Sequence, residues 1–188
     1  MKRGLQKMND SLSKVQKAAR VLEVLSVVAR VIVAIGAVGS LVGLAVWLVA
    51  SNIPIDGETY AEVVFRESGK DGCGMIIDCL NGFIQCASGF VIYSVSRNYF
   101  ASVRLEGTPF THKGAKAIFN LGLTALVATL VATVVSAFVT LIVTAIMNPA
   151  TLTSTEGVDG NVGIPIVLMI LSLVFHYGAD LEEQKNRE

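Results

Sequence analysis

The sequence predicts an all-α integral membrane protein, with four transmembrane helices in an antiparallel bundle and an amphipathic helix at the N-terminus. Its 188 residues are 53% hydrophobic and 16% charged, with a mean hydropathy of +0.62, whereas soluble domains usually carry about 25% charged residues. The apolar residues are concentrated in four long runs. Lys and Arg are concentrated in alternate segments around those runs. We therefore predict one membrane domain over residues 1–188.

The four apolar runs have the lengths expected of membrane spans, because a helix needs about 20 apolar residues to cross about 30 Å of hydrocarbon. The fourth run is short and would need local thinning of the bilayer or shelter among the other helices. Pro165 suits the first turn of that helix, where its missing N–H has no partner to lose. The predicted spans are residues 31–50, 75–96, 117–147 and 164–179, with extracytoplasmic loops 51–74 and 148–163 and a cytoplasmic loop 97–116.

The N-terminal segment, residues 1–25, has an apolar stripe at helical spacing and a basic opposite face. This pattern predicts an amphipathic helix suited to the anionic inner leaflet or to a partner helix. The alternative is that the segment simply continues the first span out of the membrane. The lysines that lie off the apolar stripe are Lys7, Lys14 and Lys17.

The distribution of basic residues sets the predicted orientation. The first twenty residues hold six Lys or Arg and one Asp, and the segment between spans two and three holds four Lys or Arg. The segment between spans three and four holds none. Because cytoplasmic loops retain Lys and Arg, and an even number of spans places both termini on one side, we predict a multi-pass bacterial cell (inner) membrane protein with cytoplasmic termini.

Polar side chains interrupt the second run, MIIDCLNGFIQCASGFVIY at residues 75–93. At about 100° per residue they fall on one face of the helix. Asp78 lies about one turn from the outer edge and can reach water, whereas Asn81 and Gln85 should face the bundle and hydrogen-bond to Thr or Ser of span three. The face is interpreted as a contact between helices, as the lining of a ligand site, or as a proton or ion relay. This candidate polar stripe comprises Asp78, Asn81, Gln85 and Ser88.

Small residues recur at every fourth position of the third span. Lipid gives helices no hydrophobic reason to associate, so close contact through small residues holds them together. We predict a helix-packing ridge inside the bundle, with a homo-oligomer interface as the alternative. Its members are Thr124, Ala128, Ala132, Ser136, Thr140 and Thr144. Further small residues at such spacing are Gly36, Gly39, Ser40 and Gly43 in span one and Gly82, Cys86 and Gly89 in span two.

The sequence carries no motif of a zinc protease, a phosphate-binding loop or a serine hydrolase. The three cysteines form no C-x-x-C pair and are interpreted as small packing residues. His176 and Asp180 are four residues apart on one predicted helix face, which makes them a candidate pH-sensitive pair or a solvated pair beside the membrane. We predict no catalytic, cofactor or metal site and no direct binding of nucleic acid.

Two stretches carry a family resemblance. RLEGTPFTHKGAKAIFNLG at residues 104–122 is a basic connector that enters the third span, where Thr111 is predicted to cap a helix beginning near His112. IVLMILSLVFHYGADLEEQ at residues 166–184 ends the last span. Together with the four-span layout, the chain resembles the bacterial membrane proteins catalogued as domain of unknown function 2975, the YoaS-like proteins. The resemblance implies no reaction, and implies at most a regulatory association with a small helix-turn-helix regulator.

The sequence thus predicts a non-enzymatic regulatory or accessory membrane protein whose basic N-terminus, 97–116 loop and tail contact a cytoplasmic regulatory protein. The alternative is a protein that binds or transports a small molecule or ion by means of the polar stripe.

Overall fold

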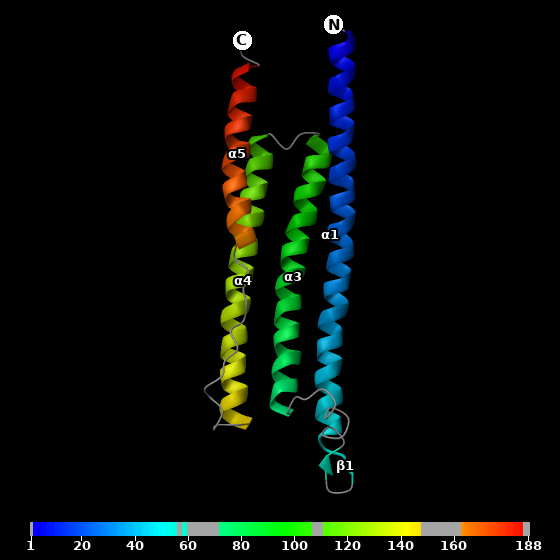
Figure 1. Cartoon of the computed structure of the whole chain (residues 1–188), viewed down its shortest axis with the longest axis vertical. Coiled ribbons are helices and arrows are strands. Elements are labelled where there is room, and N and C mark those ends of the chain that lie inside the picture. Colours follow the sequence, from blue (N-terminus) through cyan, green and yellow to red (C-terminus); the bar gives the residue numbers. More distant parts are fainter. Residues whose placement is uncertain (1, 56–57, 60–71, 107–110, 148–162, 186–188) are drawn as a thin grey trace. The chain divides into compact units, whose positions relative to one another are not determined.

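The computed structural model describes residues 2–55, 58–59, 72–106, 111–147 and 163–185. Within this part of the chain, helices predominate, and the all-α prediction is confirmed. The four long helices are α1 (Lys2–Ala50), α3 (Gly72–Glu106), α4 (His112–Met147) and α5 (Gly163–Lys185) (Figure 1).

Consecutive helices run antiparallel, and contacts between them agree with this. The middle of α1 meets the end of α3, the first third of α3 meets the last third of α4, and the start of α4 meets the last turns of α5. The pairs that establish this are Glu23 with Arg104, Asn81 with Thr140, and His112 with Asp180.

The chain forms two compact units, each built from segments of these helices. Unit 1 comprises Met1–Val31, Phe90–Thr129 and Asn161–Glu188, and therefore contains α5. Unit 2 comprises Ile32–Gly89 and Leu130–Gly160. The described part of unit 2 thus has segments of three long helices, α1, α3 and α4, and none from α5.

All four helices are long and apolar enough to cross a membrane. Large apolar side chains point outward along them, with 67% of Ile35, 62% of Phe138 and 68% of Leu173 exposed. The buried apolar residues are mostly alanine, as in Ala125 and Ala132. This is the pattern expected where the solvent is hydrocarbon, since small residues then mediate helix contact and large ones face the lipid.

The predicted separate amphipathic helix at residues 1–25 is wrong: the structure has one continuous helix, α1, from Lys2 to Ala50. The segment between Leu5 and Ile35 contains no Gly or Pro. Helices end or kink sharply mainly at such residues, so nothing local separates the basic segment from the span. The alternative interpretation, in which the segment continues span one, agrees with the structure.

The helices also extend past the predicted span limits. Helix α3 continues to Glu106, ten residues beyond the predicted span end at 96, and α4 already begins at His112. Thr111 caps α4, since its Oγ1 accepts a hydrogen bond of 2.9 Å from the backbone N–H of Gly114, and this prediction is confirmed.

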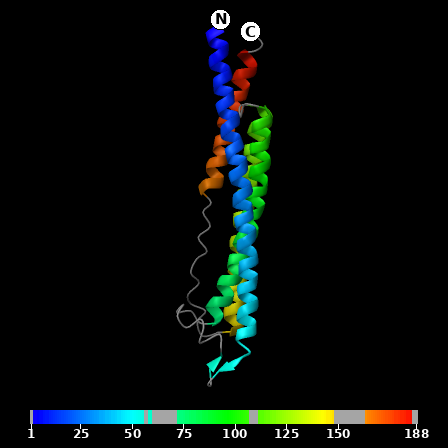
Figure 2. The same ribbon diagram turned by 90° about the vertical axis from the view of Figure 1, so that its right-hand side faces the viewer.

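A short antiparallel strand pair was not predicted. Strands β1 (Pro54–Ile55) and β2 (Glu58–Thr59) pair with Pro54 opposite Thr59 and Ile55 opposite Glu58 (Figure 2). The sequence between them is Asp56-Gly57, one of the dipeptides favoured between two tightly connected strands. That signal was present in the sequence and was overlooked.

Candidate functional site

In unit 2, α1 and α3 approach closely through small residues. A methyl group added to Gly36 would lie 3.0 Å from Cys86 Sγ. One added to Gly82 would lie 2.9 Å from Ser40 Oγ. A methyl group on Gly39, by contrast, would meet nothing within 4 Å. The contact therefore uses one face of α1, and only part of the glycine pattern in the sequence belongs to it.

Two of the three cysteines belong to this contact. Cys86 faces Gly36, and Cys79 Sγ lies 3.4 Å from where a methyl group on Gly43 would be. All three cysteines are of intermediate exposure and form no disulfide with one another. Cys79 and Cys86 thus serve as small packing residues, as predicted. The small-residue contact between α1 and α3 comprises Gly36, Ser40, Gly43, Cys79, Gly82 and Cys86.

Asn81 links the polar stripe to α4. Its Nδ2 donates a hydrogen bond of 3.3 Å to Thr140 Oγ1, which is the kind of bond expected between spans two and three. Its other polar atom, Oδ1, is buried and has no hydrogen-bond partner. Ser136, one turn before Thr140, is 0% exposed, and its Oγ also has none. The described residues of unit 2 therefore include two buried polar atoms whose hydrogen-bonding capacity is unused.

The other members of the stripe do not share this environment. Asp78 and Gln85 are exposed, and Ser88 is half-buried. The expectation that Gln85 faces the bundle is therefore wrong. A four-helix arrangement would cover that side of α3, but the described part of unit 2 has only three helix segments. The four residues share a helix face in the sequence pattern without forming one site.

The predicted ridge on α4 is buried only in its middle. Ala132 and Ser136 are 4% and 0% exposed. Ala128 and Thr140, on either side of them, are half-buried. A row of residues every fourth position winds around a helix, since four residues turn it by about 400°. Only a few members can therefore face the same neighbour.

In unit 1, α4 and α5 are in backbone contact at Gly122. A methyl group there would lie 3.1 Å from the backbone N of Met169, 3.1 Å from the backbone O of Pro165 and 2.9 Å from Met169 Cγ. Pro165 is itself buried in the first turn of α5. Gly122 therefore sets how closely the two helices can approach.

The ends of α4 and α5 bring together a histidine–carboxylate cluster, defined as His112, His176, Asp180 and Glu183. Nε2 of His112 lies 3.6 Å from Asp180 Oδ1 and 3.3 Å from Glu183 Oε2. The rings of His112 and His176 meet edge to face, with centroids 5.0 Å apart and planes at 69°. The side chains of His112, Asp180 and Glu183 are each about half exposed.

This cluster differs from the predicted pair. His176 and Asp180 do lie together, but His112 is the residue that both approach, and it was assigned to a loop. The sequence did hold a clue, because His112 falls in the predicted cytoplasmic loop that leads into span three, and His176 falls at the predicted cytoplasmic end of span four. They are also the chain's two histidines.

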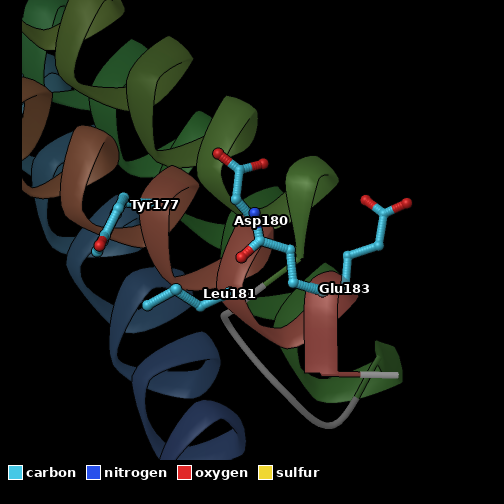
Figure 3. Close-up of a pocket in the computed structure, with 5 residues that line it drawn as sticks. Tyr177, Asp180, Leu181 and Glu183 are labelled. Carbon is cyan, nitrogen blue, oxygen red and sulfur yellow. The ribbon is translucent and has the colours of Figure 1, made fainter. Parts of the chain in front are cut away.

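The last turns of α5 border a groove of about 390 Å³. Figure 3 shows Asp180 and Glu183 projecting from one side of the helix, whereas Tyr177 and Leu181 project from another. The described residues that line the groove also include Gln184. The groove thus adjoins two carboxylates of the histidine–carboxylate cluster and combines them with apolar surface.

Comparison with models of known protein families, with curated proteins and with solved structures gives no match. The site is therefore interpreted from its own residues.

Two further cations of unit 1 are paired. Arg104 Nη1 lies 2.9 Å from Glu23 Oε2, whose side chain is 15% exposed. The separation is that of an ion pair, and this buried oxygen accepts no hydrogen bond. The guanidinium of Arg30 lies 4.6 Å from the centre of the Phe90 ring. Both contacts join α1 to α3.

Proposed function

We propose that this chain is a bacterial inner-membrane protein with both termini in the cytoplasm, and that it acts, without enzymatic activity of its own, as a regulatory or accessory protein for a soluble partner. The four apolar helices and the distribution of Lys and Arg support the location. We also propose that the chain is related to the proteins of domain of unknown function 2975, which residues 104–122 and 166–184 resemble.

The observation that carries the proposal is the extension of α1 past the end of α3. Glu23 pairs with Arg104, which is two residues before the end of α3. Helix α1 begins 21 residues earlier, at Lys2, so about 30 Å of it lies beyond this pair at 1.5 Å per residue. The extension carries strong positive charge: Lys2, Arg3, Lys7, Lys14, Lys17 and Arg20, against Asp10.

A basic helix can bind either an anionic membrane surface or an acidic protein surface. To lie on the membrane, this one would have to bend near the bilayer edge. The absence of Gly and Pro between Leu5 and Ile35, and the continuity of α1, argue against such a bend. A helix that projects from the membrane favours a soluble protein with an acidic surface as the partner.

Site-specific photo-crosslinking in intact cells tests the proposal. A photoreactive amino acid at the exposed Lys17 should crosslink to a soluble protein, and one at Val38, which is 60% exposed on an apolar face, should not. Reversing the charge of Lys7 and Lys14 to Glu should abolish the crosslink from position 17. Crosslinks to lipid alone, or crosslinks unaffected by charge reversal, would contradict the proposal.

Thiol labelling tests the orientation separately. A membrane-impermeant reagent applied to intact cells should modify Cys73 and should not modify a cysteine introduced at Lys113. Cys79 and Cys86 are replaced by Ser in both variants, and Cys73 is also replaced in the Lys113 variant, so that each protein carries a single thiol. Labelling of the Lys113 position alone from outside would reverse the proposed orientation.

A second candidate function is binding or transport of a small polar solute in unit 2. The buried, unpartnered Asn81 Oδ1 and Ser136 Oγ favour it, since such atoms in native proteins usually bind water or a ligand. A solute that raises the melting temperature of the wild-type protein should lose this effect in Asn81→Leu and keep it in Gln85→Leu, because Gln85 is exposed. An equal loss in both variants would contradict the assignment to Asn81.

A further inference from the structure

The two histidines of the chain meet although 64 positions separate them in the sequence. His112 is the first residue of α4, and His176 lies in the second half of α5. One ligand atom from each of His112, His176 and Asp180 can be chosen so that all three lie within 4.8 Å of one another. We propose that these three residues bind a divalent transition metal of the zinc type, which joins the start of α4 to the end of α5.

The separations fit such an ion. Zinc binds imidazole nitrogen at about 2.0–2.1 Å and carboxylate oxygen at about 2.0–2.2 Å. In a tetrahedral site, ligand atoms at these bond lengths are about 3.3–3.4 Å from one another. The distance from His112 Nε2 to Asp180 Oδ1 is 3.6 Å, and that to Glu183 Oε2 is 3.3 Å. Moderate side-chain rotations would bring His176 to the same distance.

The charges favour a divalent cation over a protonated histidine. Asp180 and Glu183 both direct a carboxylate oxygen at a single nitrogen of His112. One protonated imidazole carries one positive charge, which would be shared between two negative groups. A divalent ion would balance both carboxylates and would bind both imidazoles in their neutral form.

The choice of residues defines the class of metal. Imidazole together with carboxylate suits Zn²⁺, Co²⁺ and Ni²⁺, whereas Mg²⁺ and Ca²⁺ prefer sites made of oxygen atoms only. His176 and Asp180 are four residues apart on α5, the spacing at which two helical side chains can bind one ion. His112 supplies the ligand from the second helix, and Glu183 is placed to take the fourth position. The half-exposed side chains leave a path for the metal to enter.

The consequence is a reversible link between two helices. Metal binding to residues of both α4 and α5 stabilises whatever arrangement brings them together, in proportion to metal concentration and affinity. This inference uses the side-chain geometry alone and does not depend on the proposed partner or on membrane orientation.

Cobalt titration of the full-length protein in detergent tests the site. The protein is purified without a histidine tag, and Cys73, Cys79 and Cys86 are replaced by Ser, so that neither tag nor thiol binds the ion. Co²⁺ should bind with one ion per chain, should give the visible absorption of four-coordinate cobalt, and should be displaced by Zn²⁺. Mg²⁺ in excess should leave the absorption unchanged.

Single variants separate the proposed link from an adventitious surface site. His112→Gln and His176→Gln should each abolish the four-coordinate spectrum, and Asp180→Asn should weaken binding strongly. Glu183→Gln should weaken it by about tenfold, the scale seen for supporting groups of metal sites. Because these side chains are exposed, the variants should keep the helical content and size of the parent protein, which circular dichroism and gel filtration check.

Two outcomes would overturn the proposal. In the first, cobalt binds equally well after both histidines are replaced. In the second, His112→Gln leaves binding intact, which would mean that α5 alone holds the ion and that α4 contributes nothing. Zn²⁺ should also raise the melting temperature of the parent protein and leave that of His112→Gln unchanged.

Discussion

Replacement of Gly122 by Ala should loosen the contact between α4 and α5. The new methyl carbon would lie 3.1 Å from two backbone atoms, the N of Met169 and the O of Pro165, and 2.9 Å from Met169 Cγ. Favourable contacts between carbon atoms lie at about 3.5–4.0 Å, so the helices would have to separate by several tenths of an ångström. Overpacking of this kind costs about 1–3 kcal/mol.

The opposing effect is helix propensity, since Gly→Ala in a helix interior gains up to about 1 kcal/mol. Gly39→Ala is the matched control, because a methyl group there meets nothing within 4 Å. Unfolding in mixed detergent, followed by circular dichroism, should therefore rank Gly122→Ala below Gly39→Ala by about 1–3 kcal/mol.

A second substitution tests which atoms cause the cost. Met169→Ala removes the clash with Cγ and leaves both backbone contacts, so it should restore only part of the stability lost in Gly122→Ala. Equal stability of Gly122→Ala and Gly39→Ala, or full rescue by Met169→Ala, would refute the idea that backbone contact at Gly122 fixes the helix separation.

Three further substitutions have defined outcomes in the same unfolding assay. Gly82→Ala should be less stable than Gly39→Ala by about 1 kcal/mol, because its methyl group would lie 2.9 Å from a side-chain oxygen; equal stability would argue against the α1–α3 contact. Ser136→Ala should be neutral or should stabilise by up to about 1 kcal/mol, since it removes a buried hydroxyl without a partner, and a clear loss would show that the hydroxyl is used. Arg104→Gln should destabilise the protein more than Arg104→Gln combined with Glu23→Gln, with a coupling of about 1 kcal/mol, and strictly additive effects would contradict the pair.

Much of the helix contact was visible in the sequence because it depends on residue size. Gly36 and Ser40 in span one and Gly82 and Cys86 in span two were identified by spacing, and the structure places them against one another. Gly39 fits the same pattern and faces open space. Spacing in the sequence gives the angle between two residues around one helix. Which side of that helix faces a neighbour depends on how the helices pack in the folded unit.

Gln85 shows the same limit for polar residues. It lies about 40° from Asn81 around α3. Asn81 reaches Thr140, whereas Gln85 is exposed. The expectation is that the helix bundle covers α3, whereas the described part of unit 2 contains segments of three long helices and leaves Gln85 exposed. The histidine–carboxylate cluster was missed because the predicted loop, residues 97–116, includes the first turn of α4, where His112 lies.

Size-based and polar contacts have different effects on such a molecule. Rows of small residues set how far apart two helices lie, but one row can slide along another at little cost because neighbouring steps are similar. Polar contacts between particular side chains, such as Glu23 with Arg104, fix the position of one helix along the axis of the other.

On α4, Gly122 and His112 are ten residues apart, about 15 Å, and both contact α5. A wider separation at Gly122 should therefore weaken cobalt binding at the histidine–carboxylate cluster in Gly122→Ala, while Gly82→Ala, in the other unit, should leave it unchanged.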